Sequence, residues 1–261
     1  MGSNATDALA QVQAAIAALA KERPGLKAEA QRAGARVKLT VHGTAVHASV
    51  ADEGKNALWD LAALAQRLPL EEGGARSMLQ LLASHFDQDL WGQKLGLAYE
   101  DALMGKLLVS PDVLRMEKGK VTLGVNMRRP QGRDPKAFQA SLDAAARAAG
   151  EATGGRVREG AGRYVGDPHV SDPSGPLVTT LLGIYRTEMK APDAKPLSVR
   201  GGTYARLFPR AVDFGPGFPG DLYTGHAPDE FVSLERLGQL TRMLSQALGA
   251  FAFGAPAAVQ K

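Results

Sequence analysis

The sequence predicts an α+β domain followed by an α/β segment, and three observations support this fold class. The elements between residues 37 and 163 follow the order strand, helix, insertion, two strands, helix, strand. This βαββαβ order is typical of a ferredoxin-like antiparallel sheet with two helices on one face. Residues 160–174 are rich in Gly, Pro and Asp and indicate a domain boundary. Beyond them, two short strands lie between two long helices. These elements form an α/β segment with too few strands for a sheet of its own.

The first expected elements are an amphipathic helix and a hairpin. Apolar residues recur every three or four positions from Thr6 until Pro24, which ends the helix. Residues 27–32 and 36–42 alternate on either side of a Gly turn and predict two antiparallel strands. After this hairpin we expect a loop at 43–54 and two further helices at 56–67 and 76–86.

A second hairpin and a long helix complete the predicted α+β domain. Residues 113–117 and 120–127 flank a Lys-Gly turn, an Ala-rich helix covers 135–149, and a closing strand covers 156–163. The C-terminal region is expected to contain two helices, at 176–190 and 233–251. Between them we expect short strands at 197–200 and 211–214 and a helical turn with Arg206.

These elements divide the chain into five parts. We expect a vector-like leader at 1–5, a helix and strand at 6–34, the βαββαβ domain at 35–163, the α/β segment at 166–252 and a tail at 253–261. The leader has neither the basic start nor the apolar run of a signal peptide.

The composition excludes several classes of protein. The chain has 261 residues and no cysteine, which excludes a disulfide scaffold, thiolate metal sites and a cysteine nucleophile. Its 31 Lys and Arg against 27 Asp and Glu give a net charge of +4. The sequence lacks the basic stripe with interleaved aromatic residues that indicates nucleic-acid binding. The longest apolar run is too short to span a membrane. We therefore expect neither a nucleic-acid nor a membrane partner.

Two of the five histidines are candidates for chemistry. His47 is followed by small residues and by the start of a helix, where a ligand can approach the backbone closely. His226 follows the Gly- and Pro-rich loop 215–220 and precedes Asp229 and Glu230, which suits the arm of a metal ligand, although both carboxylates equally suit the N-terminus of the last helix. The remaining histidines are not expected to carry chemistry. His42 is expected to be structural, His85 matches a His-x-Asp metal spacing only superficially because it follows a helix, and His169 is expected in a solvated loop.

Several sequence motifs occur in the same order as in a known family. Residues 43–49 (GTAVHAS) and 54–57 (GKNA) resemble the "GxxAHAS…GxNA" segment of the aminoacylase/carnosinase/PepV superfamily of zinc-dependent amidohydrolases. Further similar motifs follow in the same order, and they resemble PepV-type dipeptidases most: residues 92–98, 121–130, 201–206 (GGTYAR), 214–220 and 226–230.

The resemblance implies a function and a set of site residues. Residues up to about 163 would form the lid domain, and the region from about 166 the C-terminal part of a catalytic domain that hydrolyses a dipeptide or N-acyl amino acid bond with two zinc ions. His47 would stabilise the oxyanion, and Arg128, with Asn126 on the same strand, would hold the substrate carboxylate. The remaining implied residues line the cleft or bind metal: Gly201, Gly202, Thr203 and Arg206 at the cleft, and His226 as a zinc ligand.

The chain also departs from the family. The motifs that supply the other metal ligands and the glutamate base in an N-terminal catalytic half are absent. The resemblance thus implies weak zinc binding at most, no activity without that half, a cytoplasmic location and a homodimer formed through the lid. The alternative is a non-catalytic lid-like module that binds peptides or dimerises by an edge strand.

Overall fold

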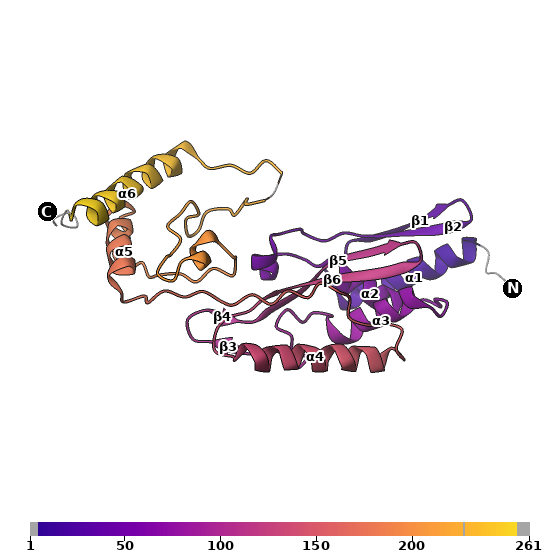
Figure 1. Ribbon diagram of the computed structural model, residues 1–261. Coiled ribbons are helices and arrows are strands. Elements are labelled where there is room, and N and C mark those ends of the chain that lie inside the picture. Colours follow the sequence, from indigo (N-terminus) through magenta and orange to yellow (C-terminus); the bar gives the residue numbers. More distant parts are fainter. Residues whose placement is uncertain (1–4, 227, 255–261) are drawn as a thin grey trace. The chain divides into compact units, whose positions relative to one another are not determined.

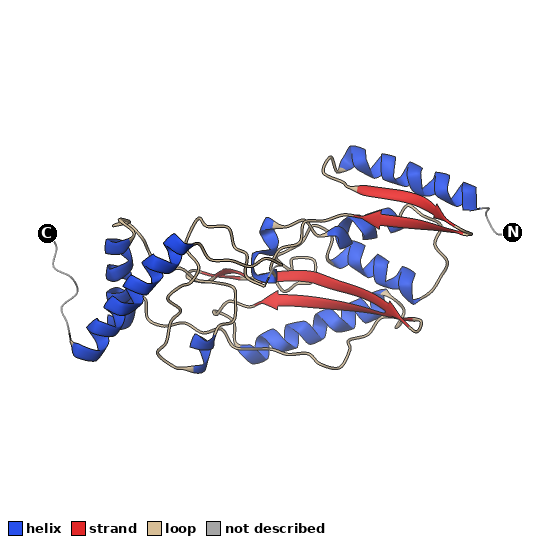
Figure 2. Ribbon diagram, turned by 90° about the horizontal axis from the view of Figure 1, so that it is seen from above, coloured by secondary structure: helices blue, strands red, loops and turns tan. Residues whose placement is uncertain are grey.

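The computed structural model describes residues 5–226 and 228–254 and divides into two compact units, Met1–Asp167 and Pro168–Lys261. Most of the predicted leader and tail lies outside the described residues. Both α-helices and small antiparallel sheets are present, as Figures 1 and 2 show, so the mixed α and β character is confirmed. No helix among the described residues is long and apolar enough to cross a membrane.

Unit 1 begins with the predicted helix and hairpin. Helix α1 (Ala5–Glu22) is followed by β1 (Ala28–Ala33) and β2 (Arg36–Val41), which pair antiparallel around Gly34. The positive φ of 64° at Gly34 is a backbone conformation that glycine adopts without strain. A small core joins these elements to the next helix through Ala15, Leu19 and Leu64.

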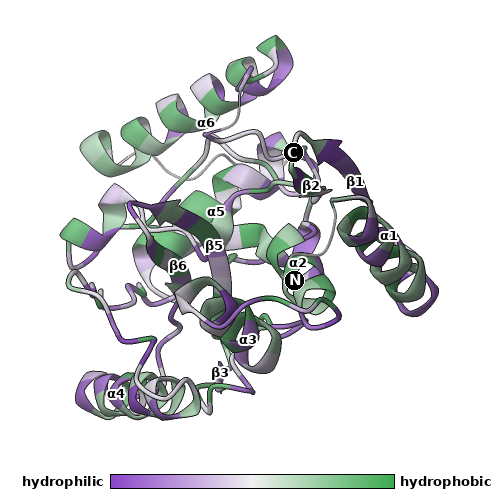
Figure 3. Ribbon diagram, turned by 90° about the vertical axis from the view of Figure 1, so that its right-hand side faces the viewer, coloured by the Kyte–Doolittle hydropathy of each residue, from purple (hydrophilic) through white to green (hydrophobic). Residues whose placement is uncertain are grey.

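The central core of unit 1 lies between three helices and a long hairpin. The 3₁₀-helix η1 (Ala48–Glu53) precedes α2 (Ala57–Ala65) and α3 (Gly74–His85). Two short strands, β3 (Glu100–Asp101) and β4 (Gly105–Lys106), precede the hairpin of β5 (Leu108–Glu117) and β6 (Lys120–Arg128), and α4 (Pro135–Ala152) follows it. Apolar side chains from these elements form one cluster, which includes Ala62, Leu82, Val109 and Phe138. Hydrophobic and hydrophilic residues interleave along α4, which turns one face to this cluster (Figure 3).

The predicted four-stranded sheet is not formed by the described residues. The strands make three separate two-stranded sheets, β1–β2, β3–β4 and β5–β6 (Figure 2). The closing strand expected at 156–163 is wrong: these residues form no ladder, and Gly162 within them has a positive φ of 106°. This segment instead follows α4: the Val157 N–H donates to Thr153 Oγ1 (3.1 Å), and Arg163 donates to Asp143 on α4.

Unit 2 is a pair of helices with irregular segments between them. Helices α5 (Pro176–Glu188) and α6 (Leu234–Phe253) are close to their predicted bounds, and the expected helical turn is η2 (Tyr204–Leu207). Their shared core contains Leu181, Ile184, Phe218, Met243 and Ala247. The strands predicted at 197–200 and 211–214 are wrong, because the described part of unit 2 has no neighbouring strand to receive their backbone hydrogen bonds.

Candidate functional site

The first candidate residue, His47, lies in a loop that its own backbone closes. Thr44 N donates to Lys55 O at 2.9 Å, and Lys55 N donates to Thr44 O at 3.0 Å, so the two ends of the loop are joined. A Cβ on Gly43 would lie 2.3 Å from Lys55 O, and one on Gly54 would lie 2.6 Å from Val46 Cγ2. Both glycines of the sequence motif are therefore required by close packing at the base of this loop.

His47 caps the helical turn that follows it. Its Nδ1 accepts a hydrogen bond from the Ser49 backbone N–H at 3.3 Å and lies 2.7 Å from Ser49 Oγ. When Nδ1 accepts this bond, a neutral imidazole carries its proton on Nε2. In that tautomer the half-buried ring has an N–H donor at Nε2.

Asn56 joins the end of this loop to the long hairpin. Its Oδ1 accepts from the Leu58 N–H (3.0 Å) and caps α2, while its Nδ2 donates to Pro111 O (2.8 Å). Pro111 lies in β5 at a register shift between β5 and β6. The Asn56 side chain thus fixes the start of α2 against β5. The partner of β5 in the hairpin, β6, contains the next two candidate residues.

Asn126 and Arg128 lie two residues apart on β6 and so share one face of the strand. Asn126 pairs with Ser110 and Arg128 with Leu108 in the β5–β6 ladder. The Nε of Arg128 is buried and has no hydrogen-bond partner among the described residues. A buried donor without an acceptor costs about 1–3 kcal/mol, and an acceptor that reached this Nε would offset that cost.

The cleft residues expected in unit 2 form a compact turn. Thr203 precedes η2, and its Oγ1 donates to Asp213 Oδ2 at 2.7 Å. A Cβ on Gly202 would lie 3.2 Å from Arg206 Nη1, so the exposed guanidinium lies against the backbone just after Gly201. Gly202 therefore leaves room for the Arg206 guanidinium beside the backbone.

His226 is exposed and has a left-handed backbone, with φ of 65°. Its backbone N–H donates to Glu230 Oε2 at 3.2 Å, and Asp229 also has a positive φ of 61°. No group of three metal-ligating His, Asp or Glu side chains exists among the described residues. One imidazole does not make a zinc site, so the residues that the structure describes do not by themselves fit the metal centre that the resemblance implies.

The other histidines make local contacts. His85 Nδ1 lies 2.7 Å from Ser84 Oγ, and His169 Nε2 lies 2.8 Å from Ala211 O. His42 Nε2 lies 3.8 Å from Glu29 Oε1 on the neighbouring strand. Each of these imidazoles thus has a contact within its own unit, including His169, which the sequence places in a solvated loop.

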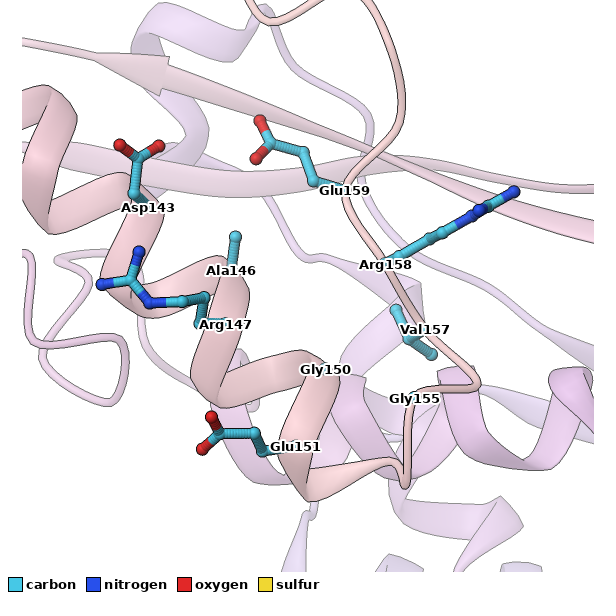
Figure 4. A pocket seen from close by; sticks show the side chains of 9 residues that line it. All are labelled: Asp143, Ala146, Arg147, Gly150, Glu151, Gly155, Val157, Arg158 and Glu159. Atoms are coloured by element: carbon cyan, nitrogen blue, oxygen red, sulfur yellow. The ribbon is translucent and has the colours of Figure 1, made fainter.

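An open hollow of about 590 Å³ lies elsewhere in unit 1, between α4 and the segment after it (Figure 4). Charged side chains of both signs, with Ala146, Val157 and two glycines, line it: Asp143, Arg147, Glu151, Arg158 and Glu159. None of the candidate residues named above lies in its lining.

One group of charged residues was not predicted from the sequence. Arg23 donates to Asp60 on α2 (2.9 Å) and to Asp87 after α3 (2.7 Å), and Lys55 Nζ lies 3.2 Å from Asp60. The available signal was Asp60 itself, a single acid within the apolar sequence of α2. It is 4% exposed, and a buried carboxylate requires cationic partners.

Sequence comparison with known proteins identifies relatives of this chain. The model of the peptidase dimerisation domain matches residues 30–95, which include His47 and its loop. YtjP of Bacillus subtilis (strain 168), which carries a provisional dipeptidase name, is 30% identical over 223 residues, covering 85% of this chain and 46% of that protein. The Beta-Ala-Xaa dipeptidase of Lactobacillus delbrueckii subsp. lactis is 34% identical over 206 residues, covering 75% and 40%.

The chain thus spans about half the length of the curated relatives it matches. The domain model and the dipeptidase names agree with the family that the ordered motifs resemble. The chain belongs to the PepV-type M20 dipeptidase superfamily.

Proposed function

We propose that this chain supplies the substrate-holding part of a metal-dependent dipeptidase, which hydrolyses the amide bond of a dipeptide or an N-acyl amino acid. The observation that carries the proposal is that unit 1 contains both an imidazole whose Nδ1 accepts from the Ser49 N–H and a guanidinium whose buried Nε has no hydrogen-bond partner among the described residues. The dipeptidase name of the Lactobacillus relative supports the reaction class.

His47 is proposed as the oxyanion donor. The carbonyl oxygen of an amide gains negative charge as the tetrahedral intermediate forms, and a pre-oriented N–H donor stabilises that charge. The bond from Ser49 N–H to Nδ1 holds the required tautomer before substrate arrives. Such a donor contributes about 10²–10³ in kcat.

Arg128 is proposed to hold the free carboxylate of the substrate, with Asn126 beside it on the same face of β6. A planar guanidinium binds a carboxylate through two parallel hydrogen bonds, which sets the register of a short peptide. A carboxylate at Nε would also satisfy the buried donor of Arg128.

Unit 2 is proposed to contribute to the cleft and to the metal centre. Gly201, Gly202, Thr203 and Arg206 would line the cleft, and His226 would supply one zinc ligand. Because the described residues contain no cluster of three ligands, the remaining ligands and the general base would come from an N-terminal catalytic half outside this chain. The chain alone is then expected to be inactive, with zinc bound weakly at most.

The assembly is proposed to be a cytoplasmic homodimer paired through the lid domain. The match of residues 30–95 to a peptidase dimerisation domain supports this pairing. The same match favours a second candidate function, a non-catalytic module that dimerises or binds peptides without cleaving them.

Kinetics of a longer protein that joins this chain to a metal-binding half would test the proposal. His47→Ala is expected to lower kcat by about 10²–10³ with a smaller change in KM. His85→Ala, which removes an imidazole outside the proposed site, is the matched control and should leave kcat unchanged. An unchanged kcat in His47→Ala would overturn the role of His47. A longer protein that binds dipeptides but never turns them over would favour the non-catalytic module.

A further inference from the structure

Four charged side chains connect the base of the His47 loop to the interior of unit 1. Lys55 Nζ lies 3.2 Å from Asp60 Oδ2, Arg23 Nη1 donates to Asp60 Oδ1 at 2.9 Å, and Arg23 Nη2 donates to Asp87 at 2.7 Å. The Asp60 side chain is 5% exposed, whereas that of Lys55 is 33% exposed. The network therefore runs from a half-exposed ammonium group into a buried carboxylate.

Asp60 is suited to hold a cation at this position. It lies in the first turn of α2, where the helix dipole favours a negative charge. A buried carboxylate also needs paired cations to offset its lost hydration, and Arg23 and Lys55 supply them. Removal of either cation would leave part of that charge uncompensated.

Lys55 connects this network to the loop through two separate parts of its structure. Its side chain reaches Asp60 and also donates to the carbonyl oxygen of Gly25, in the turn after α1. Its backbone N–H and C=O form both hydrogen bonds of the bridge with Thr44. The residue whose side chain meets Asp60 is therefore the same residue whose backbone closes the loop around His47.

We propose that Lys55, held by Asp60, is a positioning residue that fixes the orientation of His47. This inference rests on the proposed function of His47, because a fixed orientation matters most for a donor that must meet the developing oxyanion. Displacement of a catalytic group by about 1 Å can cost about 10²-fold in rate, so a buried ionic anchor at the base of the loop is an effective support.

Nuclear magnetic resonance of this chain tests the proposal without requiring activity. Lys55→Met keeps the length of the side chain but removes the ammonium group. In this variant we expect the amide protons of Thr44 and Lys55 to exchange with solvent about tenfold faster or more. We also expect the ring nitrogen shifts of His47 to move toward a mixture of tautomers, while those of His85 stay unchanged. Lys55→Arg, which keeps a positive charge beside Asp60 and can still donate to Gly25 O, should restore both signals.

Arg67→Met is the matched control. It removes an ion pair between Arg67, just after α2, and Glu22 at the end of α1 (2.6 Å), which does not include the loop. Both signals should then match those of the unmodified chain. Exchange at β5 amides such as Val109 separates a local change from a general loss of stability. If Lys55→Met unfolds unit 1, Lys55→Gln serves the same comparison.

Two results would overturn the inference. The first is an unchanged His47 spectrum and unchanged loop exchange in Lys55→Met. The second is an equal acceleration at Val109 and Thr44, because Lys55 would then contribute only to overall stability. Neither result bears on whether His47 is the oxyanion donor, which depends on the effect of His47→Ala on kcat.

Discussion

Arg128 and Arg129 are neighbours at the end of β6, and their guanidinium groups have opposite environments. Arg129 is 6% exposed and donates to Gly166 O (3.2 and 3.3 Å) and to Asp167 Oδ1 (2.6 Å). It also lies over the ring of Phe138, 5.5 Å from the centroid. The Nε of Arg128 is buried without a partner among the described residues. Arg129 is therefore held by the fold, whereas Arg128 is suited to a ligand.

This difference predicts that the two arginines contribute by different amounts to stability. Arg129→Ala should lower the free energy of unfolding by about 2–4 kcal/mol, because it removes several charge-assisted hydrogen bonds and the contact with Phe138. Arg128→Ala should change it by about 1 kcal/mol or less, because no hydrogen bond at Nε is lost. Urea unfolding followed by tryptophan fluorescence measures both, since Trp59 and Trp91 both lie in unit 1. A larger loss in Arg128→Ala than in Arg129→Ala would contradict the assignment.

The base of the His47 loop predicts a second effect. Gly43→Ala should destabilise unit 1 by about 2 kcal/mol or more, because its Cβ would lie 2.3 Å from Lys55 O and force the bridge open. Gly74, the first residue of α3, has open space where a Cβ would be placed. Gly74→Ala is therefore the control and should stabilise by about 0.5–1 kcal/mol. The same fluorescence measurement compares them, and equal stability of the two variants would disprove the close approach.

Tyr99 predicts a dependence on alkaline pH. Burial raises the pKa of the Tyr99 phenol above its ordinary value, and its hydroxyl donates to Pro130 O at 2.8 Å. The folded state therefore favours the protonated phenol, so this contribution to stability is complete below pH about 10 and is lost as the pH rises through the raised pKa. Absorbance of phenolate against pH should show a late step that disappears in Tyr99→Phe. The exposed Tyr164 provides the control: Tyr164→Phe should retain the late step.

Most of the helices and both principal hairpins could be predicted from the sequence because local signals determine them. Apolar periodicity predicts α1, α4 and α6, and a glycine at the turn predicts the β5–β6 hairpin. The prediction for β5 began too late, at 113 in place of 108, because Ser110 and Pro111 resemble a strand break. Pro111 instead lies at a register shift, where a residue without an N–H is tolerated.

The strands expected at 156–163, 197–200 and 211–214 failed for a non-local reason. A strand depends on a neighbour to receive its hydrogen bonds, and alternation of side chains does not reveal whether that neighbour exists. Residues 156–163 contact α4 through Val157 and Arg163. The described part of unit 2 contains no sheet to which the other two segments could pair.

The candidate site could be predicted in part. The motif glycines at 43 and 54 and the position of His47 follow from local sequence, and the structure gives them a physical cause in the Thr44–Lys55 bridge. The ionic network around Asp60 joins residues 23, 55, 60 and 87, which are distant in sequence. No local pattern predicts which cation meets a buried acid, so this network required the structure.

The zinc content of the purified chain tests the central claim most directly, after loading with excess zinc and removal of unbound metal. The claim is that this chain holds substrate through His47 and Arg128 and obtains its metal centre from residues elsewhere. It predicts close to zero zinc per chain, because His226 has no cluster of further ligands among the described residues. One or two tightly bound zinc ions per chain would contradict it, since the chain would then contain a metal centre of its own.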